Sequence, residues 1–324
     1  MGKKRLVSGI KSTGTLHIGN YFGAMQQQLA LQEEYESFIF IADYHSLTTT
    51  YDAERLRESI YHVAAGYLAA GINPEKTILF KQSDIPEHME LAWIFNCITT
   101  MPYLMRAHAF KDAEAKNKEI SVGTFDYPIL MAADILMYDA TVVPVGKDQQ
   151  QHIEYARDIA EKFNRMYGET FATPKGIIPE EVATLIGTDG QKMSKSYGNT
   201  IPLFAFDSEL EKLVKGIVTD SKDVHEPKDP DTDTVFAYHR LFSREQLPEL
   251  EKRYREGGIG YKESKEILLE NMKAFITPMR EAYTELMENR AQIREVLQRG
   301  AEQARPLAAA KLNDVRKKVG VGLA

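Results

Sequence analysis

Cysteine is almost absent from this sequence, which has a single one, Cys97, in 324 residues. One cysteine excludes an internal disulfide and any zinc or iron–sulfur site that is built from several cysteines. Because the neighbouring residues Trp93, Ile94 and Phe95 are apolar, we expect Cys97 to be a buried, unreactive thiol.

Long hydrophobic runs are absent as well. No stretch approaches the roughly 18 uninterrupted apolar residues of a membrane-spanning helix, so we expect no membrane contact. The first residues, Met1-Gly-Lys-Lys-Arg5, lead straight into a short apolar strand without the core of a signal peptide, which favours the cytoplasm. The net charge of −7 argues against indiscriminate nucleic-acid binding but leaves room for a local basic face.

The composition, 43 % hydrophobic and 27 % charged, is typical of a globular protein with one large domain or two ordinary ones. In the first half, short apolar strands alternate with longer helices. We expect strands at 5–8, 37–42, 77–80 and 141–145, and helices at 17–34, 52–70, 87–97, 127–138 and 150–166. This alternation predicts an α/β fold with a doubly wound, Rossmann-like parallel sheet, whose ligand lies beyond the carboxyl ends of the strands.

The pattern changes near residue 200. The acidic segment 226–233 contains two prolines, and 247–318 is almost wholly helical in character. We therefore predict a Rossmann-like domain over 1–200, with a lysine-containing insertion at about 104–122, and an all-helical domain over 201–324. The last helix of the second domain can pack back on the first.

A loop with two lysines lies between Gly187 and Gly198. Lys192 and Lys195 are three residues apart, and no apolar period here fixes a regular element. Such a loop can close over a ligand and bring two ammonium groups to one polyphosphate. A solvated basic loop is the alternative, but the pentapeptide Lys-Met-Ser-Lys-Ser is too specific to favour it.

A second short motif, His17-Ile-Gly-Asn20, lies where a turn gives way to a helix. The first N–H groups of a helix favour an anion, and His17 can donate to a phosphate oxygen. Gly19 lacks a Cβ, so a flat adenine could lie directly on the backbone. The motif alone is weak, because a helix-start histidine without a ligand is common. Together with the lysine loop it is strong.

The two motifs resemble the two signatures of class I aminoacyl-tRNA synthetases. The segments 127–138 (Tyr-Pro-Ile-Leu-Met-Ala-Ala-Asp-Ile-Leu-Met-Tyr) and 143–152 (Val-Pro-Val-Gly-Lys-Asp-Gln-Gln-Gln-His) look like the tryptophanyl-tRNA synthetase pattern. The residues Ser8, Gly9, Ile10, Gly19, Asn20, Tyr21, Asp43 and His45 fit the same family. The resemblance covers the whole chain.

This resemblance implies an enzyme that activates L-tryptophan with ATP and Mg²⁺, releases pyrophosphate and transfers the aminoacyl group to tRNA(Trp), leaving AMP. It implies a homodimer, Mg²⁺ held through the ATP phosphates with no metal site on the protein, and anticodon binding by the helical domain over 201–324. The arginines and lysines from Arg290 to Lys318 would then form a tRNA phosphate surface, whereas a solvated helix face is the alternative.

The resemblance also assigns roles to individual residues. Catalysis falls to His17, Lys192 and Lys195. The implied ATP contacts are Lys11, Ser12, Thr13, Gly19, Asn20, Gly146, Lys147, Asp148, Leu185, Lys192, Met193, Ser194, Lys195 and Ser196. The implied tryptophan contacts are Val7, Gly9, His45, Tyr127, Met131, Asp134, Val143, Val145 and Gln149.

Asp134 has two interpretations, because a carboxylate among apolar neighbours is costly to bury unpaired. It either forms a structural salt bridge with a lysine or arginine, or accepts the indole N–H of tryptophan, and the motif around it favours the second. His108, His152 and His239 receive no role.

Three other functions stay open at this point. A tyrosine-specific relative shares the fold and both signatures. A tRNA-binding paralogue without charging activity would not need His17 and the lysine pair. A small-molecule nucleotidyltransferase would not need the helical domain.

Overall fold

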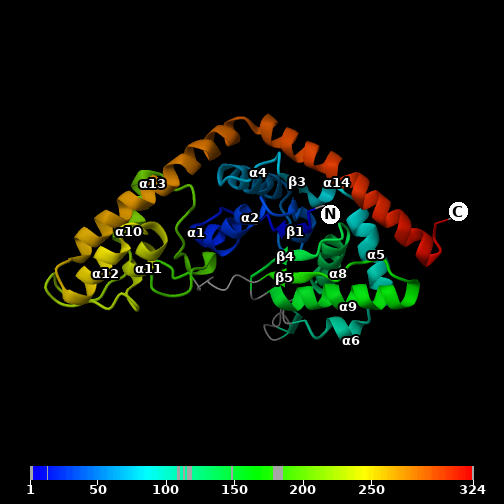
Figure 1. Ribbon diagram of the computed structural model, residues 1–324, viewed down its shortest axis with the longest axis horizontal. Helices are drawn as coiled ribbons and strands as arrows, with labels where there is room; N and C mark the ends of the chain where they lie inside the picture. Colours follow the sequence, from blue (N-terminus) through cyan, green and yellow to red (C-terminus); the bar gives the residue numbers. More distant parts are fainter. Residues whose placement is uncertain are drawn as a thin grey trace. The chain divides into compact units, whose positions relative to one another are not determined.

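The structure is a computed structural model, and it describes residues 3–12, 14–107, 110–111, 114, 119–146, 149–177 and 185–322. The chain divides into two compact units (Figure 1). Unit 1 comprises Met1–Thr15, Ala24–Glu180 and Asn289–Ala324, and unit 2 comprises Leu16–Gly23 and Glu181–Glu288. The units interleave along the sequence and do not follow a single cut near residue 200.

Unit 1 contains a five-stranded parallel sheet in the order β3-β2-β1-β4-β5. The strands are β1 (Arg5–Ile10), β2 (Glu36–Ile41), β3 (Thr77–Lys81), β4 (Val142–Pro144) and β5 (Lys175–Ile177). The predicted α/β fold with a doubly wound parallel sheet is therefore confirmed. The short strand β5 was not among the predicted strands, because three residues give too little periodicity to detect.

Helices connect these strands within unit 1. They are α2 (Gln26–Leu31), α3 (Asp43–Ser46), α4 (Ala53–Ala69), α5 (Glu87–Ile98), α6 (Met101–Leu104), α8 (Val122–Leu136) and α9 (Gln150–Tyr167), with the short 3₁₀ helix η2 (Gln82–Asp84) after β3. The predicted helix over 17–34 is confirmed over 18–31. It consists of α1 (Ile18–Asn20), a π-helical turn η1 (Tyr21–Met25) that the sequence did not predict, and α2, which follow one another without a break. Such π-turns are frequent at functional sites.

Close packing in the sheet accounts for one of the predicted site glycines. Gly9 on β1 pairs with Phe40 on β2, and a Cβ at Gly9 would lie 2.6 Å from the Phe40 ring. The rings of Phe38 and Tyr138 stack at 4.8 Å in the same core. Gly9 is thus required by the packing of β1, whatever it contacts in a ligand.

Unit 2 is helical apart from its loops. It contains α1, the 3₁₀ helix η4 (Lys195–Tyr197), α10 (Asp207–Lys215), α11 (Thr234–Phe242), α12 (Leu247–Glu256) and α13 (Tyr261–Glu288). Its buried centre includes Phe236, Leu250, Tyr254 and Ile259.

The last helix, α14 (Arg290–Val319), belongs to unit 1 and packs along the edge strand β3 (red in Figure 1). Gly300 of α14 touches the backbone of Leu79, and a Cβ there would overlap the Leu79 carbonyl oxygen. The basic residues of α14 pair with acidic residues of unit 1: Arg290–Glu58, Arg299–Glu75, Arg305–Glu87, Lys311–Asp139 and Arg316–Glu90, at 2.5 to 3.3 Å. These five ion pairs hold α14 against unit 1, and the predicted tRNA phosphate surface on α14 stays a prediction.

Two expectations about surfaces have different outcomes. Cys97 is exposed on α5, so the predicted buried thiol is wrong. The helix turns Phe95 into the core and leaves Trp93 and Cys97, four residues apart, on its outer face.

Within the described ranges, no helix is long and apolar enough to cross a membrane.

We expect Gly300→Ala to destabilise unit 1, because the new methyl group would push α14 away from β3. Overpacking of this kind costs about 1–3 kcal/mol, more than the roughly 1 kcal/mol that alanine gains over glycine in a helix. Calorimetry should show a lower Tm. Gly123→Ala is the matched control, since its Cβ would lie 3.9 Å from the nearest side-chain atom and should not lower the Tm. Equal Tm values for the two variants would contradict the close packing of α14.

Candidate active site

The centre of the site in unit 1 is the fully buried carboxylate of Asp134 on α8. His45 Nε2 lies 2.8 Å from Oδ2 and His88 Nδ1 lies 2.5 Å from Oδ1. Gln82 Nε2 donates to both oxygens, at 2.8 and 2.9 Å. Two histidines and an amide hold this carboxylate, and not the lysine or arginine of the salt-bridge interpretation.

These partners keep Asp134 ionised. Burial alone would raise its pKa, but the hydrogen bonds from His45 and His88 outweigh burial and lower the pKa to about 2. The carboxylate is therefore a permanent acceptor over the whole physiological pH range. A ring N–H in the neighbourhood would meet a full negative charge with little water to weaken it.

The fold brings these residues together at the carboxyl ends of the central strands. His45 lies on α3, directly after β2, and Gln82 opens η2, directly after β3. Asp43 ties the two strand ends together, because it accepts hydrogen bonds from the Ser83 backbone N–H at 3.0 Å and from the Ser83 hydroxyl. The predicted location of the ligand site, beyond the strand ends, coincides with this cluster.

Aromatic and histidine rings continue the cluster outward. The Tyr127 ring lies edge-on to His45 at 6.2 Å, and its hydroxyl is 2.8 Å from His152 Nε2. His152, to which we gave no role, therefore contacts a predicted site residue. His239, also without a role, bonds Ser243 and Ser264 in the core of unit 2, as expected of a structural histidine.

The other predicted tryptophan contacts differ in exposure. Val7 and Val143 are buried in the sheet core, whereas Met131 and Val145 lie at its margin, partly exposed. Gln149 is partly exposed, and its backbone N–H donates to Gly146 O. The structure thus gathers His45, Tyr127 and Asp134, and it places the two valines in packing positions.

In unit 2, the start of α1 is paired with the strand-like segment that follows the lysine loop. Ile18 N–H donates to Ile201 O at 3.0 Å, and Leu203 N–H donates to Leu16 O at 2.9 Å. His17 lies opposite Pro202 in this short antiparallel bridge. Two segments almost two hundred residues apart in sequence are therefore held together by backbone hydrogen bonds.

The lysine loop is more ordered than its composition predicts. Ile186 pairs with Lys192 across a small hairpin, and Lys195 opens η4. Asn199 organises the loop: it accepts from Ser194 N at 2.7 Å and donates to Lys192 O at 3.1 Å. Gly187 is required there, because a Cβ would overlap the Asn199 side chain.

The helix start and the lysine loop meet, as expected for two segments that grip one nucleotide. A Cβ at Gly19 would lie 3.2 Å from Met193 Sδ and 2.8 Å from His17 Nδ1. Burial, followed by the positive charge of Lys195, lowers the pKa of His17 to about 4. The imidazole is therefore neutral at pH 7, and burial also lowers the pKa of Lys195.

Gly19 is required for the close packing of this cradle, because the His17 ring and the Met193 sulfur lie where a Cβ would be. His17 Nδ1 is buried and has no hydrogen-bond partner among the described residues, so it can still bond an oxygen of a ligand.

The remaining predicted ATP contacts are dispersed. Asn20, Leu185, Ser194 and Ser196 lie in unit 2 with the cradle, where Leu185 O accepts from Met193 N. Lys11, Ser12 and Gly146 lie in unit 1. Ser12 is tied to the buried Ser46 hydroxyl at 2.8 Å, which gives it a structural role of its own. Thr13, Lys147 and Asp148 lie outside the described residues, as do residues 108, 109, 112, 113 and 115–118 of the predicted insertion.

Sequence reasoning missed the residues that hold the others in place. Gln82, His88 and Tyr138 surround Asp134, and Asn199 holds the lysine loop. Gln82 had a detectable signal, a polar residue directly after a buried strand. His88 and Tyr138 had none, because only the packing of α5 on α8 brings them together.

Comparison with known proteins agrees with this geometry. Residues 2–277 match the family described as tRNA synthetases class I (W and Y). The tryptophan–tRNA ligase of Campylobacter jejuni is 46 % identical over 318 residues, which cover 98 % of this chain and 100 % of that protein. The Fusobacterium nucleatum tryptophan–tRNA ligase is also 46 % identical and covers 98 % of each chain.

A solved structure leads to the same family. The tryptophanyl-tRNA synthetase from Campylobacter jejuni complexed with ADP and tryptophan superposes with a TM-score of 0.92 at 45 % identity, covering 98 % of this chain and 99 % of that one. The chain therefore belongs to the class I tRNA synthetases of the tryptophan and tyrosine family, and within it to the tryptophanyl-tRNA synthetases.

Proposed function

We propose that this chain activates L-tryptophan with ATP, forming tryptophanyl-adenylate and pyrophosphate, and then transfers the tryptophanyl group to tRNA(Trp), releasing AMP. Translation places this reaction in the cytoplasm. The observation that carries the proposal is the meeting of the His17 helix start with the lysine loop in one compact unit. Amino-acid-dependent exchange of pyrophosphate into ATP tests it, and exchange with tyrosine alone would identify a tyrosine enzyme.

The chemistry requires positioning and charge neutralisation more than a protein base, because the tryptophan carboxylate is already a nucleophile. Its oxygen attacks the α-phosphorus of ATP, and pyrophosphate leaves. The neutral His17 donates a hydrogen bond to a phosphate oxygen, Gly19 admits the adenine, and Lys192 and Lys195 neutralise the charge that develops on the leaving pyrophosphate.

The amino acid binds at Asp134 in unit 1. Its ionised carboxylate accepts the indole N–H, while Tyr127, His45 and Met131 line the space around the ring. A side chain without a ring N–H would lack this hydrogen bond to a charged acceptor and would bind more weakly.

Magnesium enters with the nucleotide. No group of three or more His, Cys, Asp and Glu side chains among the described residues has the arrangement of a metal site. In the lysine loop the hydroxyls of Ser194 and Ser196 lie 2.8 Å apart, and hydroxyl donors suit phosphate oxygens. Mg²⁺ bound with the nucleotide would offset the charge of its phosphates.

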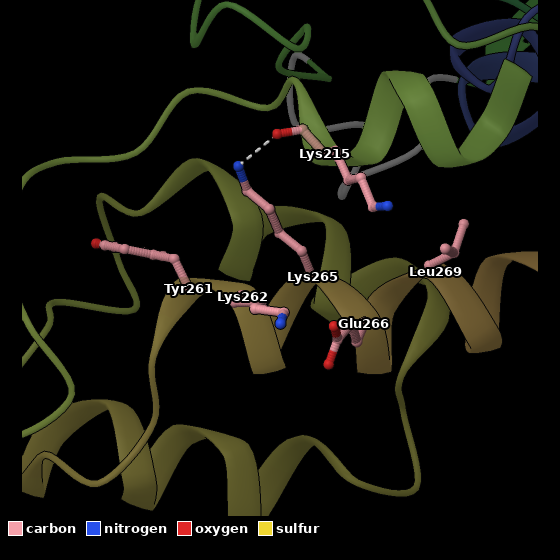
Figure 2. A pocket seen from close by; sticks show the side chains of 6 residues that line it. All are labelled: Lys215, Tyr261, Lys262, Lys265, Glu266 and Leu269. Carbon is pink, nitrogen blue, oxygen red and sulfur yellow. Dashed lines mark hydrogen bonds between the residues drawn. The ribbon is translucent and has the colours of Figure 1, made fainter.

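Basic residues of unit 2 offer a further surface for transfer RNA. A pocket of about 440 Å³ in this unit is lined by Lys215, Lys262 and Lys265 of α10 and α13 together with Glu266 (Figure 2). Lys265 Nζ donates to the carbonyls of Lys215 and Ile217 at 2.9 and 2.6 Å and so caps α10, and Lys215 pairs with Glu211 at 2.5 Å. Because two of these lysines have partners within the unit, we propose tRNA backbone contacts for the helices between 207 and 288 as a whole, consistent with an anticodon-binding role.

An exposed apolar stripe on unit 1 suits a second copy of this chain. Met89, Trp93 and Cys97 follow one another at four-residue intervals on α5, and Met101 and Met105 continue the stripe along α6. Trp93 is 69 % exposed and Met101 67 %. Large apolar side chains gathered in this way mark an interface, so the homodimer is proposed to form through this face.

Asp134→Asn should raise the KM for tryptophan by about 10- to 100-fold, because the substrate loses a hydrogen bond to a charged acceptor. The KM for ATP should change less than about threefold, since the nucleotide cradle lies in the other unit. Steady-state pyrophosphate exchange measures both constants. A parallel rise in the two would mean that Asp134 serves only folding.

Lys195→Ala should lower the rate of tryptophan-dependent pyrophosphate exchange by about 100-fold, because one cation no longer stabilises the transition state. Lys252→Ala, at an exposed lysine of α12 in the same unit, is the control and should leave the rate unchanged. Loss of tRNA affinity with an unaltered exchange rate would remove Lys195 from the chemistry.

The double variant Met89→Glu with Trp93→Glu should convert the dimer to a monomer, because buried charges without partners oppose association. Sedimentation equilibrium measures the mass. Val224→Glu is the control, since this residue of unit 2 is 46 % exposed, close to the 44 % of Met89. A double variant that sediments as a dimer would exclude this face as the interface.

A further inference from the structure

The inner side of Asp134 is closed by His88, a residue without any exposed surface. His45, the partner on the other carboxylate oxygen, has 13 % of its side chain exposed. The carboxylate therefore has an open side at His45 and a closed side at His88. The His45 side is therefore the less enclosed of the two, and His88 holds the carboxylate from the enclosed side.

His88 bridges a group on α8 and a group in the turn that follows it. Its Nδ1 lies 2.5 Å from Asp134 Oδ1, and its Nε2 lies 2.7 Å from the Tyr138 hydroxyl. Asp134 lies on α8, which ends at Leu136, and Tyr138 lies in the turn directly after the helix. A half-turn of the imidazole would replace both nitrogens by carbons and break both bonds.

The hydrogen bonds that link Tyr138, His88 and Asp134 all donate in the same direction, toward Asp134. The ionised Asp134 can only accept, so His88 Nδ1 donates to it. Burial, followed by the negative charge of Asp134, raises the pKa of Tyr138, so its hydroxyl keeps its proton and donates to Nε2. Donation at Nδ1 and acceptance at Nε2 thus satisfy both neighbours of His88.

Aromatic rings keep water away from the hydrogen bonds between Tyr138, His88 and Asp134. The His88 ring lies 5.5 Å from the Tyr138 ring and 5.8 Å from the Phe40 ring, centre to centre, and Phe80 completes the enclosure at 6.3 Å. Hydrogen bonds in such surroundings are stronger and more directional than hydrogen bonds in water. The position of the Asp134 oxygens is therefore determined by His88 and Tyr138 more than by solvent.

We propose that His88, held by Tyr138, is a positioning residue that fixes the Asp134 carboxylate for the indole N–H and so contributes to the choice of tryptophan. The inference rests on the proposed function of Asp134. His88 has no contact with the substrate and acts only through the carboxylate.

Three variants separate the contributions of the two hydrogen bonds of His88. His88→Leu removes both hydrogen bonds, His88→Asn keeps a donor near the Nδ1 position, and Tyr138→Phe removes only the hydroxyl. For each, pyrophosphate exchange gives KM for tryptophan, KM for ATP and kcat. The selectivity is the ratio of kcat/KM for tryptophan to that for β-(3-benzothienyl)-L-alanine, in which sulfur replaces the indole N–H.

We expect His88→Leu to raise the KM for tryptophan about tenfold and to lower the selectivity by a similar factor, with the KM for ATP within about twofold. His88→Asn should restore most of the selectivity, and Tyr138→Phe should fall between Leu and wild type. The matched control is His239→Leu, which removes another fully buried histidine with two partners and should lower the Tm without altering selectivity.

Unchanged selectivity in folded His88→Asn and Tyr138→Phe, together with unchanged selectivity or failure to fold in His88→Leu, would overturn the proposal and leave His88 a purely structural residue. Failure of the proposed function is a separate outcome. Wild-type protein would then show no exchange with tryptophan, or Asp134→Asn would leave the selectivity unaltered.

Discussion

A single buried negative charge dictates much of the architecture of unit 1. The Asp134 carboxylate lies in a hydrophobic core, where an unpaired charge has a large desolvation cost, so it must be surrounded by donors. Those donors come from α3, η2 and α5, so the charge ties the ends of β2 and β3 to two helices. The low pKa of about 2 is the electrostatic consequence of this arrangement. Its chemical consequence is an acceptor that never protonates under physiological conditions.

The proposed nucleotide cradle in unit 2 is held together by backbone hydrogen bonds and not by a buried charge. Its two motifs are joined by backbone hydrogen bonds between 16–18 and 201–203, so their proximity does not depend on the lysine side chains. Asn199 fixes the backbone of the loop and leaves the lysines at its surface. A backbone fixed in this way holds the lysine loop next to the start of α1 without using the lysine side chains.

The return of α14 to unit 1 changes the interpretation of its basic residues. In sequence they look like a stripe for tRNA, but five of them are paired with acids on α4, on α5, in the loop before β3 and in the turn after α8. Gly300 allows the helix to lie against the backbone of β3. The charge pattern therefore contributes to where the last helix packs.

The sequence by itself determined the elements with strong local signals. The apolar strands, the helix start at His17 and the lysine pentapeptide have the residue types that their chemistry requires, and the parallel sheet followed from their alternation. Periodicity could not show the π-helical turn at 21–25, the exposure of Cys97 or the division of the chain into interleaved units. Only the tertiary structure decided which groups surround Asp134, because His45, Gln82 and His88 are distant in sequence and meet through helix and strand packing. A local pattern records what a residue can do, whereas its partners depend on contacts that the whole fold creates.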